Sequence, residues 1–478
     1  MKRTKIICTM GPVTTPEIMK KLIENGMDIA RFNFSHGDHE EQLGRLNDLK
    51  KVREALHMPT AILLDTKGPE IRTGLLKNGK AVTLETNETF TLTTEVIQGN
   101  KERVSLSYTG LINDITKGKH ILIDDGLIEL QVINKTDTDI ICKILNGGIL
   151  GEQKGINVPN VPTRLPAITD KDKEDIKFGV EQDIDFIAAS FVRNAECIME
   201  IRAFLAECKA PYIPIIAKIE NAEGIENIDE IIRTADGIMI ARGDLGMEIP
   251  EEELPHLQKE IIQKCNDNYK PVIVATQMMD SMIRNPRPTR AEVTDVANAV
   301  YESADTVMLS GETAAGKYPV EAVKMMKHII ESTEKYLDYD LMLQKNSQHQ
   351  NQGISSAIGY ATVSAAENLK AKCIITPSIS GATSRVVSKF RPKQEIFGVT
   401  PDERALRRMQ LFWGVRPIKS VTYSTTNGVT EGAIEAIKAK DLVKIGDVVI
   451  LTAGIPSPNV KSGAREGASN MMSISVVD

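Results

Sequence analysis

The chain has little of what marks a membrane, secreted or nucleic-acid-binding protein. Its 478 residues contain no run of about eighteen apolar residues, the length that a membrane-spanning helix needs. Its basic start has no long apolar stretch before Gly11 and Pro12, so no signal peptide is predicted and the expected compartment is the cytoplasm. A net charge of −7 without any basic block argues against nucleic acid or a membrane surface as a partner.

Thiol and imidazole groups are also sparse. The six cysteines are scattered, without a CxxC pair, in a chain too long to need disulfides, so reduced thiols are expected. The seven histidines show no metal-ligand spacing, and no GxSxG motif is present. Zinc chemistry and Ser-His hydrolysis therefore have no support.

What the chain does contain is eight short runs rich in β-branched residues, most of them separated by helical patterns. Each run is apolar through its body and ends in polar or small residues, which indicates strands buried on both faces. This alternation predicts an α/β fold, a (β/α)₈ TIM barrel with its chemistry at the C-terminal ends of the strands. The runs are KIICTMG, DIARFNFS, TAILLDTKG, DFIAASFV, IPIIAKIEN, DGIMIARGD, PVIVATQ and DTVMLSGE.

Two further domains are predicted beside the barrel. The third and fourth strand runs are about 115 residues apart, too many for one helix and two loops. Short alternating runs with Asn-Gly and Asp-Gly turns in this interval are typical of a small β-barrel or sandwich. A polar stretch at 340–353 is interpreted as a linker, and the alternation beyond it indicates an open α/β domain. The expected domains are the barrel at 1–69 and 168–340, the inserted lid at 70–167 and a regulatory domain at 353–478.

Two strand ends carry polar residues at alternate positions. Arg31, Asn33 and Ser35 share one face at the end of the second run. Lys218 and Glu220 do the same at the end of the fifth, where a cation beside a carboxylate suits phosphate and metal together. The alternatives are an ordinary strand end running into solvent and a structural salt bridge.

Three other strand ends add candidates. Asp244 follows the sixth run, and together with the Glu220 carboxylate it could hold one Mg²⁺ whose other ligands are water and substrate oxygens. Gly243 has no side chain, so the backbone there has room to approach a ligand. Asp65 and Thr66 end the third run. Because adjacent strand residues face opposite sides, Thr66 is expected to offer its carbonyl if both bind an ion.

Thr276 closes the seventh run and adds a hydroxyl to the same mouth. Lys67, Glu70 and Arg72 stand at the neck of the inserted domain. A run from Gly311 to Lys317 resembles a P-loop, but Tyr318 stands where that motif needs Ser or Thr. We interpret this run as a barrel loop.

Taken in order, these motifs resemble those of the pyruvate kinase family over the whole chain, in its compact bacterial form. The resemblance implies a barrel, an inserted lid and a regulatory domain, and transfer of the phosphoryl group of phosphoenolpyruvate to ADP, giving pyruvate and ATP. The matching motifs are ARFNFSHG, LDTKGPEIRTG, IPIIAKIENAEGI, ARGDLG, ATQMMDSM, RPTRAEVTDVANAV and LSGETAAGKYP.

The resemblance also implies a role for each matching residue. Lys218 would stabilise the phosphoryl group in flight, and Arg31 would contact phosphate. Glu220 and Asp244 would bind Mg²⁺ or Mn²⁺, with Asp244 also close to the substrate. Gly243 and Thr276 would bind the carboxylate of the substrate, with Thr276 near the proton-delivery path. K⁺ would be bound by Asn33, Ser35, Asp65 and the Thr66 carbonyl. The nucleotide would be bound by Asn33, Arg72 and Lys154.

Glu70 predicts potassium dependence. The resemblance implies this, because family members with Glu at this position look potassium-dependent, whereas those with Lys there do not. An ammonium group can replace a monovalent cation, whereas a carboxylate cannot.

The segment TPSISGATSRVVSKFRP at 376–392 resembles the family's effector-phosphate loop, with Ser378, Ser380, Gly381 and Thr383 as candidate contacts to a phosphorylated small molecule. An ordinary helix N-cap is the alternative. The match departs from the pattern of sugar-bisphosphate-responsive members at Ile379, and where they often carry an Arg this chain has Gly463, with Arg465 two residues later.

Two rival functions stay open. One is a Mg²⁺-dependent lyase or mutase of the phosphoenolpyruvate-binding barrel group, which would not need a nucleotide-binding inserted domain. The other is a catalytically inactive barrel kept as an effector-binding or scaffolding protein, against which the intact set of polar strand ends argues. The resemblance further implies a homotetramer in which domain movement links the effector loop to the active site.

Overall fold

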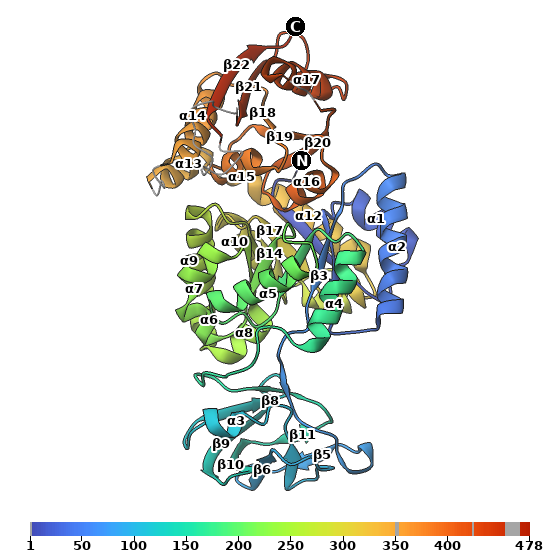
Figure 1. Ribbon diagram of the computed structural model, residues 1–478, viewed down its shortest axis with the longest axis vertical. Helices are drawn as coiled ribbons and strands as arrows, with labels where there is room; N and C mark the ends of the chain where they lie inside the picture. The colour runs from blue at the N-terminus through green and yellow to red at the C-terminus, as the bar shows by residue number, and fades with distance from the viewer. Residues whose placement is uncertain (1, 349–352, 423–424, 455–468) are drawn as a thin grey trace.

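The computed structural model describes residues 2–348, 353–422, 425–454 and 469–478. Figure 1 shows three units along the long axis, with the barrel between the inserted domain at one end and the C-terminal domain at the other. Over the described ranges, no helix combines the length and the apolar character needed to cross a membrane.

The predicted barrel is confirmed, because all eight predicted runs form parallel strands that close on themselves in the order β1-β17-β16-β15-β14-β13-β3-β2. The strands are almost entirely buried, which explains why they read as continuous apolar runs. They are β1 (Lys5–Met10), β2 (Ile29–Asn33), β3 (Ala61–Asp65), β13 (Phe186–Ala189), β14 (Ile215–Ile219), β15 (Gly237–Ala241), β16 (Val272–Ala275) and β17 (Thr306–Leu309).

Helices surround the barrel, and several of them begin at side-chain caps. Thr169 and Thr289 form capping boxes, each with the acidic residue three positions later, which satisfies two backbone N–H groups. The principal helices are α1 (Pro16–Glu24), α2 (His39–Ala55), α4 (Asp170–Glu181), α5 (Ala195–Glu207), α7 (Ile228–Thr234), α9 (Leu254–Asp267), α10 (Arg290–Tyr301) and α12 (Pro319–Thr333). Short helices at the strand ends are α6 (Ala222–Glu226), α8 (Arg242–Glu248) and α11 (Gly311–Ala314).

The inserted domain is a seven-stranded sheet in the order β4-β12-β8-β9-β10-β6-β7. A bridge between Thr73 and Leu106, which follow the two edge strands, brings those edges together and favours the barrel over the sandwich. Its elements are β4 (Ile71–Arg72), β5 (Val82–Leu84), β6 (Thr89–Thr93), β7 (Arg103–Ser105), α3 (Leu111–Asp114), β8 (His120–Ile123), β9 (Ile128–Lys135), β10 (Asp139–Asn146), β11 (Gly148–Leu150) and β12 (Gly155–Asn157).

The C-terminal domain is the predicted open α/β sheet, in the order β20-β19-β18-β21-β22, with only β22 antiparallel. The stretch at 340–353, interpreted as a linker, is helical over most of its length, and Asn346 in it donates to the Lys389 carbonyl. The elements are α13 (Tyr339–Gln348), α14 (Ile354–Asn368), β18 (Cys373–Pro377), α15 (Ala382–Lys389), β19 (Glu395–Thr400), α16 (Glu403–Arg408), β20 (Val415–Lys419), α17 (Thr426–Lys438), β21 (Val448–Ala453) and β22 (Met471–Val476).

An aspartate precedes each of four barrel strands, and these aspartates link neighbouring strands at the N-terminal end of the barrel. Asp28, Asp185, Asp236 and Asp305 each accept a hydrogen bond from a backbone N–H near the start of the neighbouring strand. Two of these carboxylates also reach the C-terminal domain. Asp185 Oδ1 contacts Arg407 Nε at 2.6 Å, and Asp305 Oδ1 contacts Arg391 Nη1 at 2.8 Å. Buried ion pairs of this kind orient one domain on the other, and losing one partner is costly.

Lys389 is buried at the same domain interface without a hydrogen-bonding partner for its Nζ among the described residues. The ammonium lies 4.0 Å from the ring centre of Tyr269. Burial lowers the pKa of Lys389 to about 8, against a weaker opposing effect of Asp267. Its charged form is therefore disfavoured in the folded protein.

We expect Lys389→Met to stabilise the protein by about 1–3 kcal/mol at pH 7. Below pH 8 the lysine is charged in both the folded and the unfolded chain, so the folded protein bears the whole desolvation cost. Between pH 8 and 10.5 the folded lysine loses its proton first, so the advantage of Met should shrink. Thermal unfolding midpoints at pH 7 and pH 10 measure this, with the exposed Lys372→Met as the control. A lower midpoint for Lys389→Met at pH 7 would show that the Tyr269 contact outweighs burial.

Candidate active site

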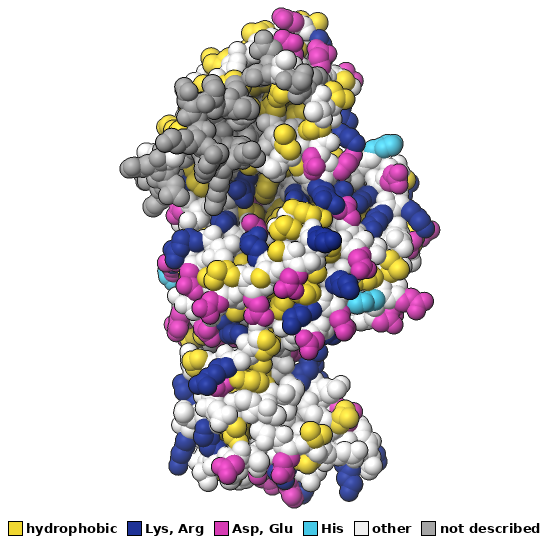
Figure 2. Space-filling view, in the orientation of Figure 1, with side chains coloured by type: hydrophobic (Ala, Val, Ile, Leu, Met, Phe, Trp, Pro, Cys, Tyr) yellow, Lys and Arg dark blue, Asp and Glu magenta, His cyan; other side chains and the backbone are white. Residues whose placement is uncertain are grey.

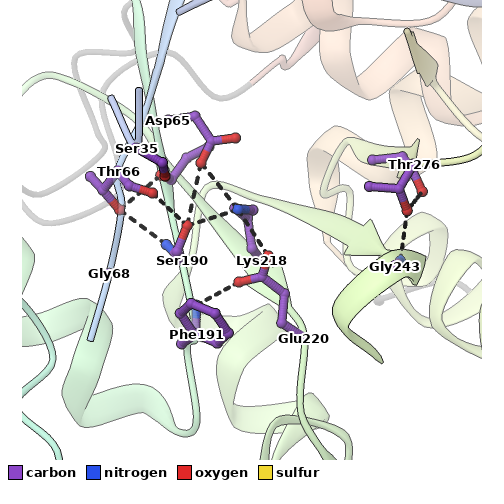
Figure 3. A network of polar contacts seen from close by, with 12 residues as sticks. Ser35, Asp65, Thr66, Gly68, Ser190, Phe191, Lys218, Glu220, Gly243 and Thr276 are labelled. Atoms are coloured by element: carbon purple, nitrogen blue, oxygen red, sulfur yellow. Dashed lines mark hydrogen bonds and ion pairs between the residues drawn. The ribbon is translucent and has the colours of Figure 1, made fainter. Parts of the chain in front are cut away.

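Polar side chains converge at the C-terminal mouth of the barrel, around the ammonium of Lys218 (Figure 3). Its Nζ lies 2.7 Å from Ser190 Oγ, 2.8 Å from Glu220 Oε1 and 3.1 Å from Asp65 Oδ1. Burial alone would lower the pKa of Lys218, but the two carboxylates outweigh it and raise the pKa above its ordinary value. The side chain is therefore a permanent, preoriented cation.

Asp65 holds a second cation on its other oxygen. Arg31 Nε donates to Asp65 Oδ2 at 2.6 Å, and Arg31 Nη1 donates to Thr9 Oγ1 at 2.9 Å. Burial would raise the pKa of Asp65, yet Arg31 and Lys218 outweigh it and keep the pKa low. One buried carboxylate thus fixes two positive groups, one on β2 and one on β14, a pair that suits an anionic substrate.

Two carboxylates could hold a divalent metal at this mouth. Burial raises the pKa of Glu220 to about 7 despite Lys218, and a nearby Asp244 adds to the rise. The pKa of Asp244 is also raised, chiefly by burial. Among the described residues no cluster of three or more His, Cys, Asp or Glu is placed to bind a metal. A hard cation that takes two carboxylates and keeps water or substrate oxygens fits this donor set, as Mg²⁺ does.

Thr276 and the backbone of Gly243 lie side by side at the mouth, just beyond the paired strands β16 and β15 (Figure 3). The Gly243 N–H donates to Thr276 Oγ1 at 2.7 Å, and that hydroxyl donates to the Ala275 carbonyl at 2.6 Å. Thr276 has a φ of 69°, in the left-handed region that β-branched residues rarely adopt. Such backbone conformations persist where the surroundings hold them, often at functional sites.

Of the four residues predicted as potassium ligands, Asp65 and Thr66 lie deep in the mouth and Asn33 and Ser35 lie at its rim. The Thr66 hydroxyl donates to the Ala188 carbonyl at 3.3 Å, while the Thr66 carbonyl accepts from Ser190. Asn33 Oδ1 accepts from the Ser35 N–H at 3.1 Å. Their carboxylate, amide, hydroxyl and carbonyl oxygens are suitable donors for a monovalent cation.

Arg72 ends β4 of the inserted domain, and Lys154 directly precedes the adjoining strand β12. Arg72 Nε contacts Glu70 Oε2 at 2.7 Å, and Lys154 Nζ contacts Asp124 Oδ1 at 2.9 Å. Both side chains are 38% exposed, so a ligand could reach them. A cleft of about 200 Å³ between the barrel and the inserted domain is lined by Glu70, Glu220 and Asp244 among others.

The run from Gly311 to Lys317 is a barrel loop, as interpreted. The carboxylate of Glu312 is buried there and accepts from the backbone N–H groups of Met279 and Ser310. Those two bonds occupy N–H donors that a bound phosphate would need, and a Cβ on Gly316 would meet the Glu312 carbonyl at 2.4 Å.

Sequence and structure comparisons bear directly on this arrangement. The family model described as "Pyruvate kinase, barrel domain" matches residues 1–323, and the one described as "Pyruvate kinase, alpha/beta domain" matches residues 356–475.

The chain belongs to the pyruvate kinase family.

Curated pyruvate kinases from two bacteria match this chain over its full length. The one from Staphylococcus epidermidis is 47% identical, with 81% of its own length covered, and the one from Geobacillus stearothermophilus is 48% identical, with 80% covered. A solved pyruvate kinase from Cryptosporidium parvum superposes with a TM-score of 0.94 at 40% identity. That match covers 100% of this chain and 96% of the other.

The residues predicted to form an effector loop in the C-terminal domain lie around the start of α15. Gly381 has a φ of +79°, and its N–H donates to Ser378 Oγ at 3.0 Å. Ser380 is exposed, whereas Thr383 is buried and accepts from the Ser469 hydroxyl. An open cavity beside them is lined by Ser378 and Gly454 among others. Gly463 and Arg465 lie outside the described residues.

Two residues of the mouth were not found from the sequence. Ser190 follows β13, and its hydroxyl contacts Lys218 and the Thr66 carbonyl. Thr9, near the end of β1, holds Arg31. Ser190 ends the fourth run, FIAAS, with a polar group as the selected strands do, so the same signal could have found it. Thr9 carries no signal, because a buried threonine within a strand run is ordinary.

Proposed function

We propose that the mouth of this barrel transfers the phosphoryl group of phosphoenolpyruvate to ADP, giving pyruvate and ATP. The observation that carries the proposal is the buried Lys218 ammonium, held by three contacts beside a pair of carboxylates. A phosphoryl group in flight carries charge on its equatorial oxygens, and fixed cations supply most of its stabilisation.

Arg31 on β2 and Lys218 on β14 would both bind the phosphate and so orient it. Glu220 and Asp244 would hold Mg²⁺ or Mn²⁺, which would supply further positive charge to the phosphoryl oxygens. The three N–H donors of the Lys218 ammonium are directed at Ser190, Glu220 and Asp65. A substrate that binds Lys218 must therefore replace at least one of these contacts. Glu220 is the contact most easily given up, since its carboxylate has a second role as the metal ligand.

Thr276 and the backbone of Gly243 would hold the carboxylate of the substrate. Their mutual hydrogen bond keeps one N–H and one hydroxyl at the mouth, available for exchange with a ligand. Thr276 would also lie near the path by which a proton reaches the enolate formed after transfer. Arg72 and Lys154, on the inserted domain, and Asn33 would contact the nucleotide.

We expect activity to require potassium. Asn33, Ser35, Asp65 and the Thr66 carbonyl offer oxygens for the ion, and Glu70 places a carboxylate where a lysine would be needed to replace it. Steady-state assays in potassium chloride and in choline chloride at equal ionic strength measure this. Full activity without potassium would contradict the prediction, and restoration of activity in Glu70→Lys without potassium would strengthen it.

The C-terminal domain would bind a phosphorylated small molecule near Ser378, Ser380, Gly381 and Thr383, where hydroxyls adjoin the N-terminus of α15. Self-association into a homotetramer is supported by β22, an edge strand on which Ile474 and Val476 are half exposed.

The first experiment is pyruvate formation from phosphoenolpyruvate and ADP with Mg²⁺, with and without potassium, and with sugar phosphates or AMP. We expect pyruvate and ATP in equal amounts. Pyruvate without ATP formation would indicate phosphatase activity instead. No pyruvate under any of these conditions would favour a lyase or mutase, or an inactive, effector-binding barrel.

A further inference from the structure

Ser190 occupies the centre of the network in Figure 3, between the proposed potassium ligands and the proposed catalytic lysine. Its side chain is 4% exposed. Two acceptors lie near Ser190 Oγ, the Thr66 carbonyl at 2.7 Å and Asp65 Oδ1 at 3.3 Å, and the shorter contact takes the hydroxyl proton. The oxygen then accepts from Lys218 Nζ, also at 2.7 Å. One hydroxyl therefore joins a backbone carbonyl to an ammonium.

The turn that contains Ser190 also binds the carboxylate of Glu220. Phe191 has a φ of 54°, and this left-handed bend directs its N–H to Glu220 Oε2 at 2.7 Å. Ser190 thus holds Lys218 through its side chain, and the adjacent Phe191 holds Glu220 through its backbone N–H. A positive φ on a bulky residue indicates a conformation that its surroundings enforce.

Tight packing leaves the Ser190 side chain little freedom. A Cβ on Gly68 would lie 2.7 Å from Ser190 Cβ and 3.0 Å from the Phe191 ring. The Ser190 N–H also donates to Thr66 Oγ1 at 3.1 Å, so the strand-end segment from Thr66 to Gly68 and the turn at 190–191 are locked together. A shift of the Thr66 carbonyl would therefore move Ser190 and, with it, the ammonium of Lys218.

We propose that Ser190 is a positioning residue that transmits occupancy of the Thr66 carbonyl by a monovalent cation to the orientation of Lys218. A carbonyl oxygen has two lone pairs and can accept from Ser190 while it also coordinates a cation. A cation there would hold the carbonyl in one position, and the hydroxyl that donates to that carbonyl would be held with it. Ser190 does not touch the reacting atoms, and it acts through Lys218. This inference rests on the proposed function.

The test is Ser190→Ala, with Ser190→Cys to separate the hydrogen bonds from the volume of the side chain. We expect kcat to fall about 10- to 100-fold in both variants, with a change of no more than a few fold in KM for phosphoenolpyruvate, as for loss of one hydrogen bond to a charged group. The matched control is Ser388→Ala, a buried serine of the C-terminal domain that donates to the Trp413 carbonyl at 2.7 Å. It should leave both kcat and potassium affinity unchanged.

Potassium affinity is read without catalysis, from the rise of the thermal unfolding midpoint as potassium chloride replaces choline chloride. We expect the apparent dissociation constant for potassium to rise about tenfold in Ser190→Ala. Wild-type kcat and potassium affinity in Ser190→Ala would overturn the proposal, as would a loss of kcat with unchanged potassium affinity. Wild-type behaviour of Ser190→Cys would assign the effect to packing and overturn it too. If the wild-type protein itself shows no potassium response, the proposed potassium site fails, independently of Ser190.

Discussion

Lys218→Met is expected to lower turnover by roughly 10²–10³-fold or more, the scale for losing one donor that acts on the transition state. Methionine keeps much of the length of the side chain but removes the cation that Asp65, Glu220 and Ser190 hold in place. Steady-state kcat and KM for phosphoenolpyruvate measure the loss. Turnover within a few fold of the wild type would contradict the role given to Lys218.

Removal of this cation also leaves two buried carboxylates less compensated, so the folded state must be checked in the same variant. Its thermal unfolding midpoint and its binding of Mg²⁺ separate a misfolded protein from an inactive one. The exposed lysine Lys324→Met is the matched control, and it should leave kcat and the unfolding midpoint unchanged.

Glu220→Gln should have the second largest effect, a loss of about 10²-fold or more in activity at a fixed, low Mg²⁺ concentration. Glutamine keeps an acceptor for the Phe191 N–H but loses the charge that a divalent cation requires. Titration of activity with Mg²⁺ and with Mn²⁺ should show a much higher concentration for half-maximal activity. An unchanged metal requirement would remove Glu220 from the metal site.

The pH dependence gives a second measurement on the same residue. Burial raises the pKa of Glu220 to about 7, so protons compete with the metal below that pH. The wild-type metal requirement should therefore rise as the pH falls below 7 and level off above it, and this dependence should be lost in Glu220→Gln. Glu334→Gln is the matched control. This buried glutamate accepts from the N–H groups of Arg3 and Thr4 at the opposite end of the barrel, and its change should leave the metal requirement unaltered.

Much of the architecture was predictable because buried parallel strands leave a strong local signal. Strands covered on both faces are continuous apolar runs, and all eight barrel strands were identified in this way. Helix α13 was missed, because its polar composition hid a helix that packs Asn346 against the C-terminal domain. Tertiary contact, not local pattern, decides such a segment.

The candidate site was predictable in part for a similar reason. Polar residues that end apolar strands must meet at one mouth when the strands are parallel, so Arg31, Lys218 and Asp244 could be named from their places in the sequence. The roles given to them here stay predictions. Ser190 shared that signal and was overlooked, and Thr9 gave none, because a threonine inside an apolar strand is also an ordinary core residue.

The sequence by itself determined which strands form, which side chains lie at their ends and, through the family motifs, which reaction the chain performs. Only the tertiary structure decided which of those groups touch. Asp65 pairs with both Arg31 and Lys218, and Ser190 links Lys218 to the Thr66 carbonyl, which lies 124 residues from Ser190 in the chain. Periodicity specifies the face on which a side chain lies, whereas the distances and pKa shifts that give it chemistry depend on closure of the barrel and exclusion of water.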